Sequence, residues 1–400
     1  MKRRVVVTGL GSVSPFGKGA DVLWKNLAAG ESGLKKITLF DASELRNDLA
    51  GEVPGYEAPR SSGEATRAER FLLDAVAEAA GTAGLERVPP ERKGLVTGTN
   101  FGGLAAAEFA LCPDIDKEGA GAAGAGGDLS GYLFDGAASH VAAAHDLAGP
   151  SSTLSLSCAS GAAALALACE AIRAGRADAM LAAAYDELSL FCYAGLSALR
   201  AVTTETIRPF DAKRSGTLFG EGAGALVLEE YESARKRGAP ILAEVAGAAL
   251  TNEAFHMTAP EKEGRGIARL MAAALEDAGV APGEIDHVNC HGTGTKYNDV
   301  IETRAVKSVF GEHARKLTLT ANKSMLGHTM GAAGLHESIA AIMTIRHDLV
   351  PPTVNYRTPD PECDLDCVPN AAREAAVRTV LKTNYGIGGT NAAVVFRRAE

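Results

Sequence analysis

The 400-residue sequence has few aromatic residues and no long apolar run. Aromatic residues make up only 5% of the chain, so the hydrophobic 46% consists mostly of alanine, valine and leucine. No segment reaches the ~20 consecutive apolar residues that a membrane-spanning helix needs. The basic start of the chain leads into a short apolar run that ends at Gly9, which is typical of a first β-strand rather than a signal peptide. These absences predict a globular α/β protein without a membrane segment.

An excess of positive charge is also missing. The chain has 40 Lys and Arg against 49 Asp and Glu, a net charge of −9, which argues against general binding to nucleic acid or to anionic membranes. The seven cysteines are an odd number and lie mostly in apolar segments, so we expect reduced thiols and a cytoplasmic location. Cys363 and Cys367 have no second close pair, so we expect no metal site.

Strand-like and helix-like segments alternate along the chain, and the pattern restarts after the charged stretch Ser233–Gly238. Such alternation predicts mostly parallel sheets covered by helices, here in two halves, 1–238 and 239–400. A Gly- and Ala-rich tract at 119–127 is expected to form a loop. The expected strands lie at 4–9, 95–99, 152–156, 177–184, 222–229, 241–245, 287–290, 317–321, 377–383 and 391–397. The expected helices lie at 20–27, 67–81, 129–145, 264–278, 301–310 and 329–347, with a further one from just after Cys158 to about Arg173.

Cys158 lies between a predicted strand and a predicted alanine-rich helix. The free N–H groups and the positive dipole end of a helix favour thiolate over thiol. A strand–Cys–helix turn is therefore a suitable place for a nucleophile. Taken alone, this stretch is equally consistent with a small buried cysteine in the core.

Two histidines also follow predicted strands and are flanked by glycine: His291 and His328. A cysteine with a histidine indicates a nucleophile with a base or an electrostatic partner, and a second neutral histidine can donate N–H to a developing oxyanion. Lys323 and Glu302 are candidates for balancing charge in such a site, or for ordinary surface charges. Parallel α/β sheets bind ligands beyond the carboxyl ends of their strands, where these residues are expected to gather.

Three other functions fit the residues less well. A thiol protease explains neither the second histidine nor the Gly-rich turn at 386–389. The Gly-rich stretch 220–224 lacks the Lys-Ser/Thr of a phosphate-binding loop. The first strand leads to Gly9-Leu10-Gly11 without the third glycine of a dinucleotide fingerprint.

With these residues in view, the chain resembles the condensing enzymes of the thiolase superfamily, specifically the type II elongating β-ketoacyl-[acyl carrier protein] synthases. The similar segments occur in the family's order and span nearly the whole chain. They are Val5–Gly11, Ser157–Gly161, Arg208–Asp211 with Gly220–Gly224, Asn289–Thr295, Lys323–His328 and Gly386–Asn391.

The resemblance implies a thiolase-like, duplicated, five-layered α/β/α/β/α fold that acts as a dimer. It also implies an acyltransferase that condenses malonyl-carrier with a Cys-bound acyl chain by decarboxylative Claisen chemistry. Cys158 would carry the acyl chain, and His291 and His328 would assist decarboxylation and stabilise the enolate. The backbone N–H groups of Cys158 and Ile387 would form an oxyanion hole. Lys323 and Glu302 match the family's supporting charged pair.

For its other contacts, the resemblance implies that Thr293 and Thr295 touch a pantetheine arm that arrives on an acyl carrier protein, so no separate cofactor is expected. Arg67 and Arg70, at a helix start, resemble the family's basic docking site for that acidic carrier. Ordinary solvated surface charge remains the alternative for both arginines.

Three departures from the family pattern concern the acyl substrate. Leu156-Ser157 replaces Thr-Ala before the nucleophile, and Ile387 replaces a phenylalanine gate. Phe101 is larger than the residue that usually lines the acyl tunnel, and a bulky tunnel residue limits chain length. We therefore expect a substrate other than a routine long saturated chain.

Pathway and partner remain open at this point. The alternative to fatty-acid elongation is a polyketide or aryl-polyene ketosynthase paired with a chain-length-factor-like subunit, so the chain could form a homodimer or a heterodimer. A noncatalytic partner subunit is disfavoured because Cys158 and both histidines are present. A degradative thiolase is disfavoured because residues 385–389 contain no second cysteine.

Overall fold

The computed structural model describes residues 2–57, 65–111 and 133–399. Within them, eleven strands form one continuous sheet built from two halves of five strands, with the short β2 (Gly17–Lys18) paired to β1. The first half has the order β1 (Val5–Ser14), β8 (Gly222–Glu230), β7 (Ala179–Asp186), β5 (Lys93–Gly98), β6 (Ser151–Leu154). The second half has the order β9 (Ala243–Asn252), β15 (Thr390–Arg397), β14 (Thr379–Tyr385), β10 (His287–Asn289), β11 (Thr318–Thr320).

The two halves repeat the same pattern of strand directions. In each half the first two pairings are antiparallel and the last two are parallel. Residues Val5–Val7 of β1 pair antiparallel with residues 243–245 of β9 and join the halves. The duplicated fold is thus confirmed, but the expectation of mostly parallel sheets is wrong. One cause is local, because the tight turn at 386–389 returns β15 antiparallel beside β14.

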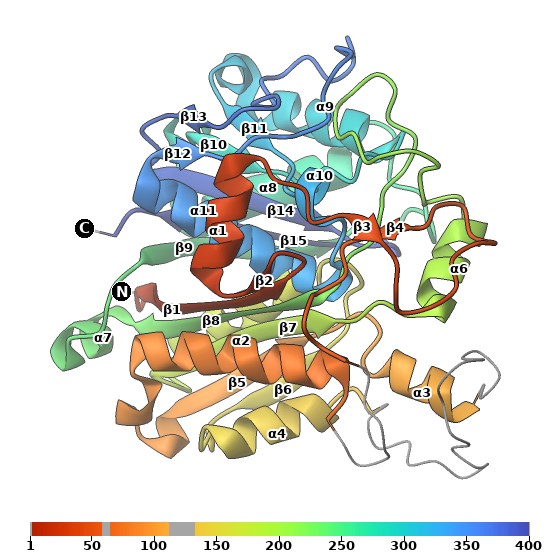
Figure 1. The fold of residues 1–400 in the computed structure, drawn as a ribbon. Coiled ribbons are helices and arrows are strands. Elements are labelled where there is room, and N and C mark those ends of the chain that lie inside the picture. The colour runs from red at the N-terminus through yellow and green to blue at the C-terminus, as the bar shows by residue number, and fades with distance from the viewer. Residues whose placement is uncertain (1, 58–64, 112–132, 400) are drawn as a thin grey trace.

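Helices complete five layers around these strands (Figure 1). On the outside of the first half, α2 (Arg67–Ala83) packs on β1, β8 and β7, and α4 (Gly136–Ala144) packs on α2. On the outside of the second half, α8 (Arg265–Ala278) covers β9 and β15 and contacts α9 (Asn298–Phe310). Between the halves, α5 (Ser160–Arg173) and α11 (Ala333–His347) contact each other and strands of both halves.

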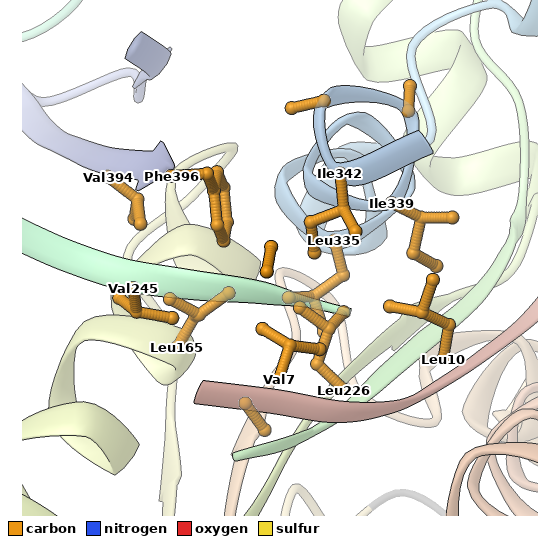
Figure 2. Packing of buried hydrophobic residues seen from close by; sticks show 14 of the residues in the cluster. Val7, Leu10, Leu165, Leu226, Val245, Leu335, Ile339, Ile342, Val394 and Phe396 are labelled. Atoms are coloured by element: carbon orange, nitrogen blue, oxygen red, sulfur yellow. The ribbon is translucent and has the colours of Figure 1, made fainter. Parts of the chain in front are cut away.

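The central layer is an apolar core that both halves share. Figure 2 shows Val7 and Leu226 from the first half, Val245 and Phe396 from the second, and Leu165 of α5 within one cluster. These side chains are at most 1% exposed. Burying them stabilises both central helices, since a fully buried Leu or Phe contributes about 1.5–3 kcal/mol. The core therefore fixes how the amino ends of α5 and α11 meet.

Glycines let those amino ends meet without a gap. A Cβ atom on Gly161 of α5 would lie 2.7 Å from the carbonyl oxygen of Gly331, and one on Gly334 of α11 would lie 2.4 Å from the amide nitrogen of Ala162. Neither position accommodates a side chain. The turn before α5, which holds Cys158, and the turn before α11, which holds His328, are consequently neighbours.

The remaining elements are short, and several were not predicted. They are α1 (Ala20–Ala29), β3 (Lys35–Lys36), β4 (Leu49–Ala50), α3 (Leu104–Leu111), α6 (Leu190–Ala198), α7 (Tyr231–Arg237), α10 (Lys323–Leu326), β12 (Leu349–Val350) and β13 (Arg373–Glu374). α7 occupies the charged stretch expected to separate the halves and ends at Gly238, whose φ of 71° suits glycine. Of the helix expected at 129–145, the described residues form only α4. The tract 119–127 lies outside the described residues.

No helix among the described residues is long and apolar enough to cross a membrane. Nor does that part of the chain hold a group of three His, Cys, Asp or Glu side chains placed to bind a metal.

Candidate active site

Cys158 occupies a strained turn between β6 and α5. Ser157 before it has a φ of 50°, a left-handed conformation that is uncommon for a residue with a side chain. The hydroxyl of Ser160 locks this turn by donating to the carbonyl of Ser157 at 2.6 Å and accepting the N–H of Leu156 at 2.8 Å. Strain held in place by surrounding hydrogen bonds is typical of functional turns.

The turn at 386–389 lies directly against Cys158. Thr390 donates its hydroxyl to the carbonyl of Leu156 at 3.1 Å. Gly386 is required there, since a Cβ atom would lie 2.8 Å from that same oxygen. The backbone N–H groups of Cys158 and Ile387 both favour the anion of Cys158 by lowering the pKa of its thiol. Both N–H groups therefore act on the sulfur, and their role as an oxyanion hole stays a prediction.

His291 and His328 face each other across the same site. Their rings meet edge to face, with centroids 5.4 Å apart. His328 stacks on Phe219 at 5.8 Å, and its backbone forms a bridge with the same residue. His291 lies edge to face with Tyr385 at 5.3 Å. Both imidazoles are therefore fixed by aromatic neighbours as well as by the backbone.

Hydrogen bonds set the tautomer of each imidazole. The Nδ1 of His328 accepts the N–H of Met330 at 3.1 Å, which leaves the proton on Nε2. That Nε2 is buried and has no hydrogen-bond partner among the described residues. The Nδ1 of His291 lies 3.2 Å from the ammonium of Lys323 and 3.3 Å from the side-chain amide of Asn384, two donors that likewise place the proton on Nε2.

Both histidines are neutral at physiological pH. Burial lowers the pKa of each imidazole well below its usual 6.5, and the nearby positive charge of Lys323 lowers it further. Two neutral rings that carry their protons on Nε2 are hydrogen-bond donors suited to an oxygen that gains negative charge during a reaction.

Burial is also the largest influence on the pKa of the Cys158 thiol. It raises the pKa of the Cys158 thiol to about 11, although the charge of Lys323 works in the opposite direction. The expectation of a resting thiolate is therefore wrong, because desolvation of the sulfur outweighs the dipole of α5. The raised pKa favours the protonated thiol, which must lose its proton during the reaction.

Alkylation of Cys158 by iodoacetamide is expected to accelerate with pH toward about 11, since only the thiolate reacts. Lys323→Met should shift this profile to higher pH because it removes the charge that lowers the thiol pKa. Intact mass at timed intervals measures the rate, and Cys158→Ser reports the background from other cysteines. A rate already at its plateau near neutral pH would contradict the protonated resting state.

A buried ion cluster lies behind the histidines, and it corrects the predicted pairing of Lys323 with Glu302. The ammonium of Lys323 forms its ion pair with Glu337 of α11. Glu337 also binds Lys382 of β14 at 2.8 Å. Glu302, on α9, instead accepts the backbone N–H groups of His291 and its neighbour at 2.8 and 2.9 Å. Glu337 lies on α11 of the central layer, whereas Glu302 lies on α9, which packs against α8 outside the second half.

Sequence reasoning missed Glu337, Lys382 and Asn384, although a signal existed. Glu337 lies in the part of α11 that is buried, residues 333–345, and Lys382 lies inside a strand that is buried along its whole length. Asp186 was missed as well. Its buried carboxylate, whose pKa burial raises to about 6, accepts the N–H groups of Phe101 at 2.9 Å and Gly331 at 2.6 Å. It thereby ties the end of β5 to the turn that carries His328.

The residues predicted to contact substrate have varied surroundings. Thr293 and Thr295 lie together, with hydroxyls 2.9 Å apart. Phe101 is partly buried against the cluster that contains Cys192. Ile387 is 46% exposed, which is compatible with a gate position.

The prediction that Arg67 helps to dock the carrier protein is wrong. Arg67 is only 4% exposed and forms an ion pair with buried Glu221, so it is unavailable to a carrier protein. Arg70, three residues further along α2, is half-buried and donates to the carbonyl of Glu57. The prediction fails at Arg67 because Glu221, 154 positions away in sequence, comes to lie beneath α2.

Comparison with known proteins agrees with this geometry. The β-ketoacyl synthase N-terminal domain matches residues 2–234, and the β-ketoacyl synthase C-terminal domain matches residues 242–357. A putative polyketide β-ketoacyl synthase 1 of Streptomyces halstedii is 41% identical, covering 100% of this chain and 99% of its own. The 3-oxoacyl-[acyl-carrier-protein] synthase 2 of Coxiella burnetii is 37% identical and covers 99% of each chain.

Solved structures give the same result. A ketosynthase complexed with its type II polyketide acyl-carrier protein and bound to the hexaketide has a TM-score of 0.91 at 34% identity. The ishigamide ketosynthase/chain length factor has a TM-score of 0.90 at 36% identity, and both cover 100% of each chain. From its duplicated fold, its site and these full-length matches, the chain belongs to the β-ketoacyl synthase family.

Proposed function

We propose that this chain is a β-ketoacyl-[acyl carrier protein] synthase that condenses an acyl group held on Cys158 with a malonyl group held on a carrier protein. One observation carries the proposal. A thiol beside two backbone N–H groups shares a site with two neutral histidines, and the buried Nε2–H of His328 has no hydrogen-bond partner among the described residues. Such a site can stabilise two oxyanions in succession, a tetrahedral intermediate and an enolate, through N–H donors and without a base of high pKa.

In the first half-reaction, the sulfur of Cys158 attacks the thioester carbonyl of the acyl-carrier. The N–H groups of Cys158 and Ile387 stabilise the tetrahedral oxyanion. The carbon–sulfur bond to the carrier then breaks, and the thiol proton leaves with the carrier sulfur. The products are the acyl-enzyme and a free carrier thiol.

In the second half-reaction, the malonyl-carrier loses its carboxylate as CO2, and the electron pair of the broken bond forms an enolate. The Nε2–H groups of His291 and His328 donate to the enolate oxygen and lower the energy of this step. The enolate carbon attacks the acyl carbonyl on Cys158, the thioester bond breaks, and the sulfur takes up one proton. The product is a β-ketoacyl-carrier. Water must be excluded meanwhile, or the acyl-enzyme would hydrolyse.

The charged residues have supporting roles in this proposal. Lys323 lowers the pKa of both histidines and of the thiol, so it keeps the imidazoles neutral while easing proton loss from Cys158. Glu302 fixes the backbone of His291 through two N–H bonds. Thr293 and Thr295 are the proposed contacts for the phosphopantetheine arm, which arrives on the carrier as part of the substrate.

Reconstitution tests the function directly. We expect purified chain, an acyl-carrier and malonyl-carrier to yield β-ketoacyl-carrier, detected as its mass on the carrier. Malonyl-carrier alone should give slow loss of CO2. Absence of any condensed product across acyl groups of different length would overturn the proposal.

A polyketide or polyene pathway is the second candidate, favoured by the relatives that are named as polyketide ketosynthases and by the ketosynthase/chain length factor structure. In that case the chain pairs with a related subunit instead of a second copy. β6 is an edge strand, and Phe134 and Leu167 are exposed apolar residues that such a partner would cover. Light scattering of the chain alone, and coexpressed with a chain-length-factor-like protein, separates the two assemblies.

The proposed docking site for the carrier protein includes Arg70 but not the buried Arg67. The proposed location of the protein is the cytoplasm. If Arg70 docks the carrier, Arg70→Glu raises the KM for carrier-bound substrates and leaves acyl-CoA analogues unaffected. An equal rise for both kinds of donor would remove Arg70 from the docking site.

Phe101→Ala is expected to raise the rate with long acyl chains relative to short ones. We expect the ratio to change about tenfold, the order at which apolar pockets discriminate by size. Competition between short, long and unsaturated acyl-carriers measures it. Phe191→Ala, on a side chain that is 66% exposed, is the matched control. A wild-type preference for long saturated chains would contradict the proposed limit on chain length.

A further inference from the structure

Lys382 is a buried ammonium for which the proposed reaction has no use. Its side chain is fully buried in β14. Three oxygens hold its Nζ: the carboxylate of Glu337 at 2.8 Å, the side-chain oxygen of Asn384 at 2.7 Å, and the carbonyl of Thr383. Removing an ammonium from water is energetically unfavourable. A group so placed needs a compensating role.

Lys382 is not needed to neutralise the carboxylate of Glu337. Lys323 already forms an ion pair with this carboxylate, so Lys382 gives the cluster a second positive charge for one negative charge. Burial lowers the pKa of the Lys382 ammonium from 10.5 to about 8. Replacing Lys382 by an apolar residue would leave the Lys323–Glu337 pair in place.

Asn384 provides the link to the chemistry. An amide can present either its oxygen or its NH2 to a neighbour, and the neighbours decide which. Because the ammonium of Lys382 can only donate, it holds the Asn384 oxygen on its own side. The NH2 group is thereby directed to Glu337 at 2.9 Å and to the Nδ1 of His291 at 3.3 Å.

We infer that Lys382 is a positioning residue that fixes the side-chain amide of Asn384 and, through it, keeps the proton of His291 on Nε2. The inference rests on the proposed function of His291 as an enolate donor. Without Lys382 only the carboxylate of Glu337 still orients the amide, and an amide that turns presents to Nδ1 an oxygen, which favours the opposite tautomer. Lys323 then remains as the only donor to Nδ1. Enolate stabilisation by Nε2–H would weaken, while acyl transfer to Cys158 does not use His291.

The tautomer can be observed directly by NMR correlation of the imidazole nitrogens in the full-length protein labelled with 15N-histidine. Wild type is expected to show His291 as Nε2–H. Lys382→Met should give a mixture with Nδ1–H and lower malonyl decarboxylation about tenfold, the order for losing an orienting partner of a functional histidine. Acylation of Cys158 should be unchanged. Lys93→Met, at another buried lysine at the start of β5, is the matched control and should alter neither.

Asn384→Asp covers the case in which Lys382→Met fails to fold. It keeps a partner for Lys382 but offers His291 a carboxylate, so His291 should move to Nδ1–H. If His291 stays Nε2–H in whichever variants fold, or if acylation and decarboxylation fall together, Lys382 has no positioning role. Failure of the proposed function looks different, because wild type itself would then neither accept an acyl group nor decarboxylate malonyl-carrier.

Discussion

His328→Ala is expected to lower decarboxylation of malonyl-carrier by about 10²- to 10³-fold, the loss found on removing one oxyanion donor. The buried Nε2–H of His328 has no acceptor among the described residues, and the N–H of Met330 holds the ring in that orientation. A donor of this kind is already aligned before an enolate forms. Acyl transfer to Cys158 should persist, since it relies on backbone N–H groups.

The comparison of two rates makes this result specific. Release of CO2 from malonyl-carrier measures the first rate, and intact mass of the acyl-enzyme measures the second. His347→Ala, on an exposed imidazole that stacks on Trp24, is the control and should leave both rates unchanged. If His328→Ala abolishes acyl transfer to the same extent as decarboxylation, His328 is not a selective enolate donor.

Glu337→Leu is expected to lower the free energy of unfolding by about 3–5 kcal/mol, the cost of removing one partner of a buried ion pair. Glu337 is the only carboxylate bonded to the ammonium groups of Lys323 and Lys382 in the described residues, and the side chains of all three are at most 2% exposed. Without it two cations remain buried together. Urea titration followed by circular dichroism measures the change.

The pH dependence of that stability has a definite sign. Burial alone would raise the pKa of Glu337. The ammonium groups of Lys323 and Lys382 have the larger, opposite effect, so the pKa is lowered from 4.5 to about 2. Its contribution is therefore complete above pH 4.5 and is lost as the pH falls toward 2. Glu337→Leu should be less stable than wild type at neutral pH and converge with it in acid. A constant difference across that range would contradict the ion cluster.

The candidate site was predictable from sequence where its residues lie in turns with a local signature. Cys158, His291 and His328 are each marked locally by a preceding strand or by flanking glycines, and the structure brings their turns together. The duplication was visible as well, because alternation restarts after the first half. These features depend on short-range order, which the sequence displays directly.

The failures concern partners that lie far apart in the chain. The ion pair of Lys323 depends on whether Glu302 of α9 or Glu337 of α11 comes to lie beside it in the fold. Spacing along the sequence does not reveal this. Arg67 resembles a surface charge until Glu221 is placed beneath it. The thiolate expected from the α5 dipole is absent because burial, a tertiary property, outweighs a local field. The directions of the central strands likewise follow from pairing across the sheet.

Intact-mass spectrometry of the full chain, incubated with a panel of acyl-carriers, tests the central claim most directly. Wild type should gain the mass of one acyl group from at least one carrier, and subsequent malonyl-carrier should remove it. Cys158→Ala should gain nothing. An acyl adduct on wild type that persists in Cys158→Ala, or no adduct from any carrier, would contradict the assignment of Cys158 as the acyl-accepting nucleophile.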